Sequence, residues 1–132
     1  MKTKILFTLL VIFFLSSCSD STSPTEIKFN SSVDGKYISV TSGNKLTVEL
    51  DVYADAGYRW DYTISNTKIV EIDSVCFKPK NPNELVCGGA TIQTIYFHTI
   101  RPGRSEVYLY EHRSWEEDTP PIKTITFNVR VK

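Results

Sequence analysis

The sequence predicts an all-β protein, and three observations lead to that class. Apolar and polar residues alternate in short runs, as at Leu46, Val48, Leu50 and Val52, which is the period-two pattern of a half-buried strand. Turn-forming residues separate these runs, and no segment keeps a helical period. The number and length of the runs predict two sheets packed face to face, an immunoglobulin-like β-sandwich of about seven to eight strands. A closed barrel is the alternative.

The expected strands follow one another with short turns between them. They cover residues 26–30, 37–41, 45–52, 60–65, 70–77, 91–99, 105–112 and 122–131. The last run shows its buried face most clearly, because Ile125, Phe127, Val129 and Val131 alternate with polar residues. Glycine, proline and asparagine mark the turns, for example at Pro102-Gly103.

The N-terminus has the features of a lipoprotein signal peptide. Lys2 and Lys4 precede an uncharged apolar run, residues 5–15, which is shorter than the about 20 residues that span a bilayer. The next residues, Leu-Ser-Ser-Cys, end at Cys18 and resemble the bacterial lipobox, in which the cysteine becomes the lipid-bearing first residue of the mature protein. An ordinary signal peptide with an incidental cysteine is the alternative.

These features predict the domain organisation and the location. We expect a signal peptide at residues 1–17, a lipidated flexible tether at 18–25 and a single domain at 26–132. The lipid on Cys18 would hold the domain in the bacterial cell envelope, either in the periplasm or exposed at the surface.

The net charge of the mature chain bears on which partners it can bind. Cleavage removes Lys2 and Lys4 from the 15 basic residues and none of the 15 acidic residues, which leaves a formal charge of −2. That balance, with no basic run, gives no support to nucleic-acid binding.

Cys76 and Cys87 remain in an oxidising compartment, where a bridge between them would close a loop of about a dozen residues. Two free thiols are the alternative.

An enzyme or a metal site has little support in the sequence. His98 and His112 are the only histidines; the first falls within a strand and the second at the edge of a loop. Nucleophilic catalysis needs a nucleophile with a base and an orienting acid, and two cysteines tied in a bridge could not serve as the nucleophile. The chain contains no His-x-His or Cys-x-x-Cys pair, so we expect no metal and no cofactor.

Three connections between strands are too unusual to be plain turns. The first, residues 54–59, contains Gly57, which permits a positive φ or the close approach of a partner. The second, residues 78–90, is rich in glycine towards its end, and the third, residues 111–121, carries Arg113 and Trp115. Arginine and tryptophan dominate binding hot spots, although Trp115 could instead fold back on the edge of the sandwich.

Motifs in these connections resemble those of chagasin-type inhibitors of papain-like cysteine proteases. Gly57-Tyr58-Arg59-Trp60 match the end of the family's Asn-Pro-Thr-Thr-Gly-Tyr-x-Trp loop. The stretch Cys87-Gly88-Gly89-Ala90-Thr91 resembles its glycine-rich loop, and Arg113-Ser114-Trp115 resembles its Arg-Pro-Trp. The resemblance covers residues 30–132, and the three motifs occur in the family's order.

The resemblance implies a chagasin-like sandwich that inhibits a protease without chemistry of its own. The three loops would enter the active-site cleft as a rigid wedge, with Trp60 bracing the first loop from below and Trp115 stacking on one wall. The implied protease-binding residues come from all three loops: Asp55, Ala56, Gly57, Tyr58, Trp60, Gly88, Gly89, Ala90, Thr91, Arg113, Ser114 and Trp115. The implied partner is a papain-like cysteine protease, met by a monomer.

The sequence departs from the family pattern at two points. Tyr53-Ala54 and Asp55-Ala56 replace Asn-Pro and the two threonines of the first loop, and Ser114 replaces the proline of the third. Loss of the prolines raises the entropic cost of binding. The alternative function is a lipid-anchored module that binds a glycan or an envelope protein, for which exposed Tyr58, Arg113 and Trp115 are equally suitable.

Overall fold

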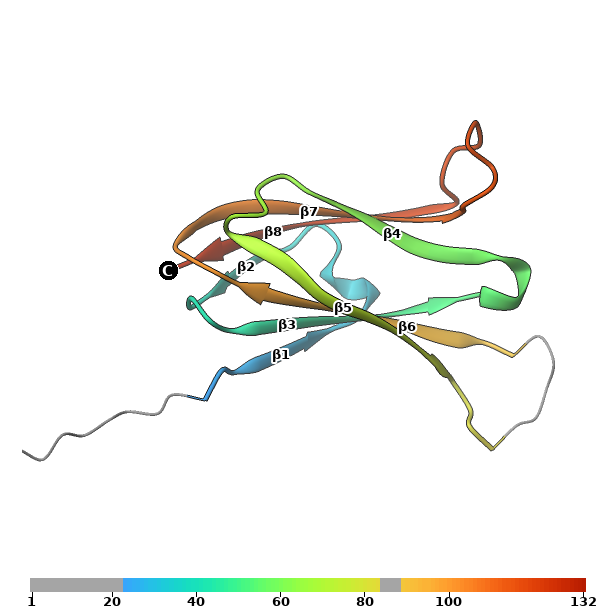
Figure 1. The fold of residues 1–132 in the computed structure, drawn as a ribbon, viewed down its shortest axis with the longest axis horizontal. Coiled ribbons are helices and arrows are strands. Elements are labelled where there is room, and N and C mark those ends of the chain that lie inside the picture. The colour runs from blue at the N-terminus through green and yellow to red at the C-terminus, as the bar shows by residue number, and fades with distance from the viewer. Residues whose placement is uncertain (1–22, 84–88) are drawn as a thin grey trace, which may run out of the picture.

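The computed structural model describes residues 23–83 and 89–132, and within them eight strands form two sheets packed face to face (Figure 1). The first sheet has the order β1–β3–β6–β5, with β1 at Glu26–Phe29, β3 at Lys45–Val52, β5 at Val70–Pro79 and β6 at Thr91–Thr99. The second has the order β2–β8–β7–β4, with β2 at Tyr37–Val40, β4 at Tyr58–Ile64, β7 at Gly103–Arg113 and β8 at Lys123–Val131. Two separate sheets confirm the predicted sandwich and exclude the closed barrel.

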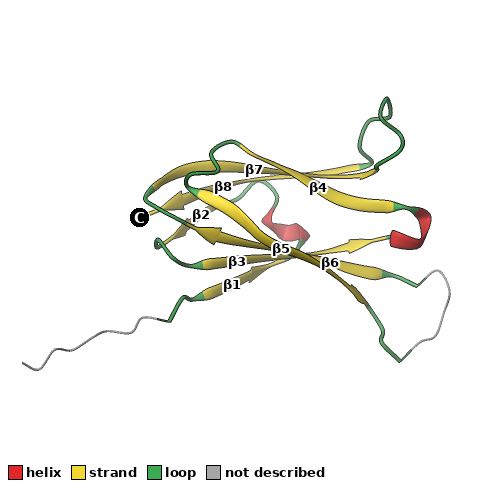
Figure 2. Ribbon diagram, viewed as in Figure 1, coloured by secondary structure: helices red, strands yellow, loops and turns green. Residues whose placement is uncertain are grey.

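All eight expected strands form, and the differences lie at their ends. β4 begins at Tyr58, two residues earlier than expected, because Tyr58 pairs with Arg113 at the end of β7. This pairing supplies backbone partners that the side-chain alternation does not reveal. Two short 3-10 helices, η1 at Ser31–Val33 and η2 at Ala54–Ala56, have no counterpart in the sequence prediction (Figure 2).

The core lies between the inner faces of the two sheets. Phe97 of β6 and Phe127 of β8 are both fully buried, and their rings meet edge to face with centroids 6.2 Å apart. Alternate residues of the strands around them complete the core, including Leu46, Val48, Leu50, Ile95, Val107, Leu109, Ile125 and Val129. Burial of this apolar surface fixes which face of each strand turns inwards.

The two ends of the sandwich differ in what they carry. The start of β1 and the end of β8 lie at one end, here called the terminal end (Figure 1). The β3–β4, β5–β6 and β7–β8 connections leave from the opposite end, here called the loop end. The strand register supports this arrangement, because the last residues of β3 and β5, Val52 and Pro79, both pair with Thr91 at the start of β6. No helix in the described part of the chain is long and apolar enough to cross a membrane.

Candidate functional site

The first loop is a tight turn that glycine makes possible. After η2, Gly57 adopts φ +81° and its N–H donates to the carbonyl of Ala54 at 2.8 Å. The N–H of Tyr58 donates to the carbonyl of Tyr53 at 3.2 Å, which closes the turn. The left-handed conformation confirms the positive φ expected at Gly57, because other residues adopt it at a cost.

The indole of Trp115 lies directly on Gly57. A Cβ added to Gly57 would stand 1.8 Å from Cη2 of Trp115, so only a residue without a side chain leaves room for the ring. Trp115 is nevertheless 64% exposed. The ring therefore joins the first loop to the third and still presents apolar surface to the solvent.

Arg113 ties the same two loops together. Its Nε donates to the carbonyl of Ala56 at 2.9 Å, and its guanidinium lies 4.4 Å from the centre of the Tyr58 ring. Its Nη1 reaches Oε1 of Glu116 at 3.0 Å, within the third loop. The guanidinium thus holds the first loop in place, and the protease contact that the resemblance implies for Arg113 stays a prediction. We call Arg113, Trp115, Gly57 and Tyr58 the loop clasp.

Trp60 supports the first loop from inside the sandwich. It is only 4% exposed, and its indole N–H donates to the carbonyl of Asp51 at 3.1 Å. Among the predicted protease-binding residues that the structure describes, Trp60 is the one that is buried. Its place agrees with the bracing role that the resemblance implies.

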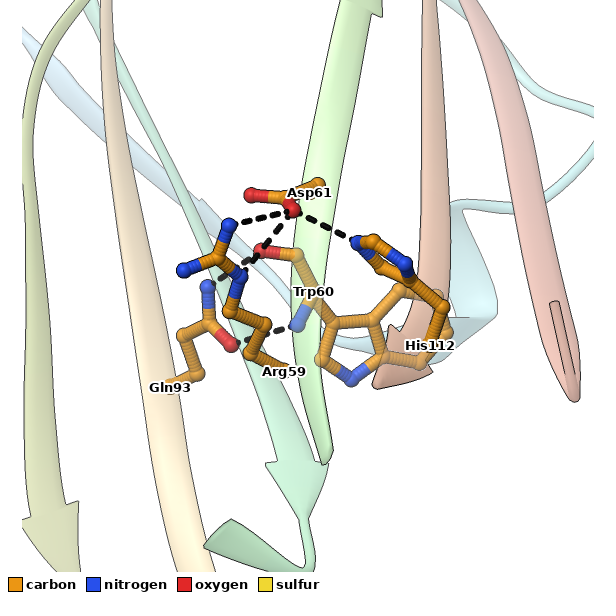
Figure 3. A network of polar contacts seen from close by, with 5 residues as sticks. All are labelled: Arg59, Trp60, Asp61, Gln93 and His112. Atoms are coloured by element: carbon orange, nitrogen blue, oxygen red, sulfur yellow. Dashed lines mark hydrogen bonds and ion pairs between the residues drawn. The ribbon is translucent and has the colours of Figure 1, made fainter. Parts of the chain in front are cut away.

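Gln93 joins the two sheets beneath the loops. Its Oε1 accepts from the backbone N–H of Trp60 at 2.7 Å, and its Nε2 donates to the carbonyl of Trp60 at 2.6 Å (Figure 3). β4 is an edge strand of its sheet, so these backbone groups need partners from elsewhere. Sequence reasoning missed Gln93; the available signal was a polar residue at an inward position of β6, in phase with Ile95 and Phe97.

A network of polar contacts on the outer face holds β4 to β7 beside the loops. Oδ2 of Asp61 accepts from Nε of Arg59 at 3.0 Å and lies 2.6 Å from Nε2 of His112 (Figure 3). His112 thus has a structural partner in Asp61. Among the described residues, no group of three or more His, Cys, Asp or Glu side chains could hold a metal ion.

A buried carboxylate lies at the base of the third loop. Glu111 is fully buried opposite Trp60, and its Oε2 lies 3.3 Å from Nζ of Lys123, which is its cross-strand neighbour on β8. The backbone carbonyl of Glu111 also accepts from the N–H of Ile122 at 2.8 Å. These contacts close the base of the third loop, and the sequence analysis did not identify them.

The second loop leaves from the same end, next to β3. The N–H of Lys80 donates to the carbonyl of Ala90 at 2.9 Å, and Nζ of Lys80 contacts both carboxylate oxygens of Asp51 at 2.9 Å. Gly89 and Ala90 are exposed and Thr91 is half-buried. Gly88 lies outside the described residues.

Within residues 23–83 and 89–132 there is no disulfide bridge. Cys76, on β5, is exposed and is not bridged to any described residue. Its expected partner, Cys87, lies outside the described residues. Pairing of the two cysteines therefore stays a prediction.

The loop end brings together most of the residues that the sequence analysis selected. Asp55, Ala56 and Ser114 are exposed, Gly57, Tyr58 and Arg113 are half-buried in the clasp, and Trp115 projects beside them. Asp55 and Ala56 belong to η2 in the first loop. In the described part of this end, the loops project from the sandwich and are held in place by Trp60, Arg113 and Trp115.

Comparison with solved structures finds the same fold in several proteins. The cysteine protease inhibitor EhICP2 from Entamoeba histolytica superposes with a TM-score of 0.73 at 18% identity, covering 82% of this chain and 96% of that one. Amebosin gives 0.67 at 17% identity, covering 83% and 100%. PbICP-C, solved in complex with falcipain-2, gives 0.53 at 16% identity, covering 82% and 99%.

Sequence comparison identifies the family. No curated protein matches the chain. The profile described as chagasin family peptidase inhibitor I42 matches residues 39–129, which is more than half of the chain and includes all three loops. The two-sheet fold, the three loops at one end and this match lead to one conclusion: the chain belongs to the chagasin family of peptidase inhibitors.

Proposed function

We propose that this protein is a reversible inhibitor of papain-like cysteine proteases and that its loop end occupies the active-site cleft. The loop clasp is the observation that carries the proposal, because it holds the first and third loops in one arrangement before any partner binds. Surfaces that are ordered in advance lose less conformational entropy on binding. PbICP-C, which shares the fold, is known in complex with falcipain-2, a protease partner of the kind proposed here.

The residues at the loop end divide into contacts and supports. We assign protease contact to the exposed residues, namely Asp55, Ala56, Gly89, Ala90, Ser114 and Trp115, together with the backbone at Gly57 and with Gly88 and Thr91 of the second loop. Trp60 and Arg113 act from behind, because their polar groups are engaged with Asp51 and Ala56. Tyr58 belongs to both groups, since one face of its ring is covered by Arg113.

The clasp compensates for the prolines that this chain lacks. Proline stiffens a loop by restricting φ, and the first and third loops have alanine and serine where the family motifs have proline. Here the hydrogen bond from Arg113 to Ala56 and the contact of Trp115 with Gly57 restrict the same two loops. We therefore expect inhibition in spite of the two departures.

Lipid attachment at Cys18 belongs to the same proposal. The lipobox-like sequence supports it, and β1 begins at the terminal end, away from the loops (Figure 1). A lipid there would leave the loop end free to meet a protease in the cell envelope. A bridge between Cys76 and Cys87 would additionally tie β5 to the second loop.

The direct test is a titration of papain with residues 19–132 against a fluorogenic substrate. We expect reversible, stoichiometric inhibition with the inhibitor chain left intact. Trp115→Ala should weaken the inhibition constant by about 2 kcal/mol, or roughly 30-fold, because exposed tryptophans at the centre of an interface act as hot spots. Absence of inhibition at micromolar protein would refute the proposal and favour a binding module for a glycan or an envelope protein.

A further inference from the structure

A groove of about 570 Å³ lies on the outer face of the second sheet, near the terminal end. It crosses β2, β8 and the start of β7, and no acidic side chain lines it. Its polar lining consists of Tyr37, Ser39, Arg104, Asn128, Arg130 and Lys132. The groove is thus separate from the loop end and plays no part in the proposed inhibition.

Positively charged side chains gather in this groove, and their mutual repulsion destabilises the sheet when no anion is bound. Arg104 and Arg130 are direct cross-strand partners on β7 and β8, and like charges in that position destabilise a sheet. Within the described residues, no carboxylate lies at ion-pair distance from Arg104, Arg130 or Lys132. Glu106, two residues from Arg104 on the same face of β7, does not line the groove.

The chemistry of the lining fits a phosphate group. Guanidinium groups present forked N–H donors that match phosphate oxygens, and Lys132 adds an ammonium. Tyr37, which is 87% exposed, places an aromatic ring with a hydroxyl at the rim. Tyrosine beside basic residues is a combination suited to the boundary between a membrane and water.

We propose that this groove binds the phosphate of an anionic phospholipid headgroup. The terminal end, where β8 and its groove residues finish, is also where the chain enters β1 from the tether (Figure 1). The third loop carries Glu116, Glu117 and Asp118 and one arginine, Arg113, so an anionic surface would repel this loop. The domain would therefore stand with its loops pointing away from the bilayer. Only the choice of a lipid over a soluble anion rests on the proposed lipid anchor at Cys18.

Nuclear magnetic resonance can locate the site on residues 19–132, which contain both complete sheets. The ligand is dihexanoylphosphatidylglycerol, kept below its micelle concentration. The shift changes that it causes should be largest at the backbone amides of Tyr37, Arg104 and Arg130. Dihexanoylphosphatidylcholine has the same tails and phosphate, but the two arginines would repel its choline cation, so its shift changes should be much smaller. Sodium phosphate should act at the same residues at least about tenfold more weakly, because it lacks the glycerol and tails.

Two variants make the test specific. The double variant Arg104→Gln/Arg130→Gln should weaken phosphatidylglycerol binding at least about tenfold and leave papain inhibition unchanged, so a failure here is separable from a failure of the inhibitor proposal. Lys78→Gln/Lys80→Gln removes the same charge near the loop end and should not alter lipid binding. Equal shifts with the two lipids, phosphate binding as strong as the lipid's, or no shift at all would each overturn the proposal.

Discussion

Gly57 has two separate reasons to be glycine, and they can be tested independently. Its φ of +81° disfavours any side chain, and the ring of Trp115 occupies the place of a Cβ. Gly57→Ala should therefore lower the free energy of unfolding by about 1–2 kcal/mol and should also displace Trp115 and weaken inhibition. Thermal unfolding and papain inhibition measure the two effects.

Gly43 provides the matched control for that substitution. Its φ is +87°, but nothing lies within 4 Å of where its Cβ would be. Gly43→Ala should lower stability by a similar amount and leave inhibition unchanged. If Gly57→Ala inhibited as well as Gly43→Ala, the contact between Trp115 and the first loop would have no part in binding.

Arg113 has contacts within the free protein that its sequence motif does not reveal. Replacement by lysine keeps the charge but cannot hold Ala56 and Glu116 in one planar fork. Arg113→Lys should weaken inhibition about tenfold and speed hydrogen exchange at the amides of Gly57 and Tyr58 in the free protein. Arg59→Lys, which breaks a similar fork to Asp61, serves as the control. Weaker inhibition with unchanged exchange would mean that Arg113 contacts the protease directly.

At the scale of the strands, the polar link between β6 and β4 sets the position of the first loop. Gln93→Leu would leave the N–H and the carbonyl of Trp60 without partners in a buried setting. Each unpaired buried group costs about 1–3 kcal/mol, so stability should fall by about 3 kcal/mol. Chemical denaturation of the variant measures that loss.

The neighbouring residue of β6 provides the control. Thr94 is 1% exposed and its Oγ1 has no hydrogen-bond partner among the described residues. Thr94→Val keeps the shape of the side chain and should leave stability unchanged or raise it. A loss for Thr94→Val equal to that for Gln93→Leu would show that any substitution at this depth destabilises, and that the link to Trp60 is not special.

The strands could be predicted from the sequence, but the contacts that organise the site could not. Alternation along β8 and β3 reveals which residues turn inwards, because each strand carries its own period. The role of Gln93 depends on the backbone of Trp60 in the other sheet, and a polar residue in an apolar run does not name its partner. Arg113 was selected as a binding residue from its motif, and the motif does not reveal that its guanidinium also contacts Ala56 and Glu116.

At the scale of the whole molecule, the two ends have separate tasks. The loop end carries the family's three motifs and most of the selected residues, and the terminal end carries the start of β1 and the cationic groove. A rigid two-sheet core between them keeps the ends apart. Inhibition should therefore be insensitive to substitutions at the terminal end, such as Arg104→Gln/Arg130→Gln.

The central claim is that the loop end fills the protease cleft, and calorimetric titration of residues 19–132 into two forms of papain tests it most directly. One form has its catalytic thiol blocked by a small methylthio group, and the other carries a covalent peptidyl inhibitor that fills the cleft. We predict tight one-to-one binding to the first form and none to the second. Equal binding to both forms would place the contact outside the cleft and contradict the account.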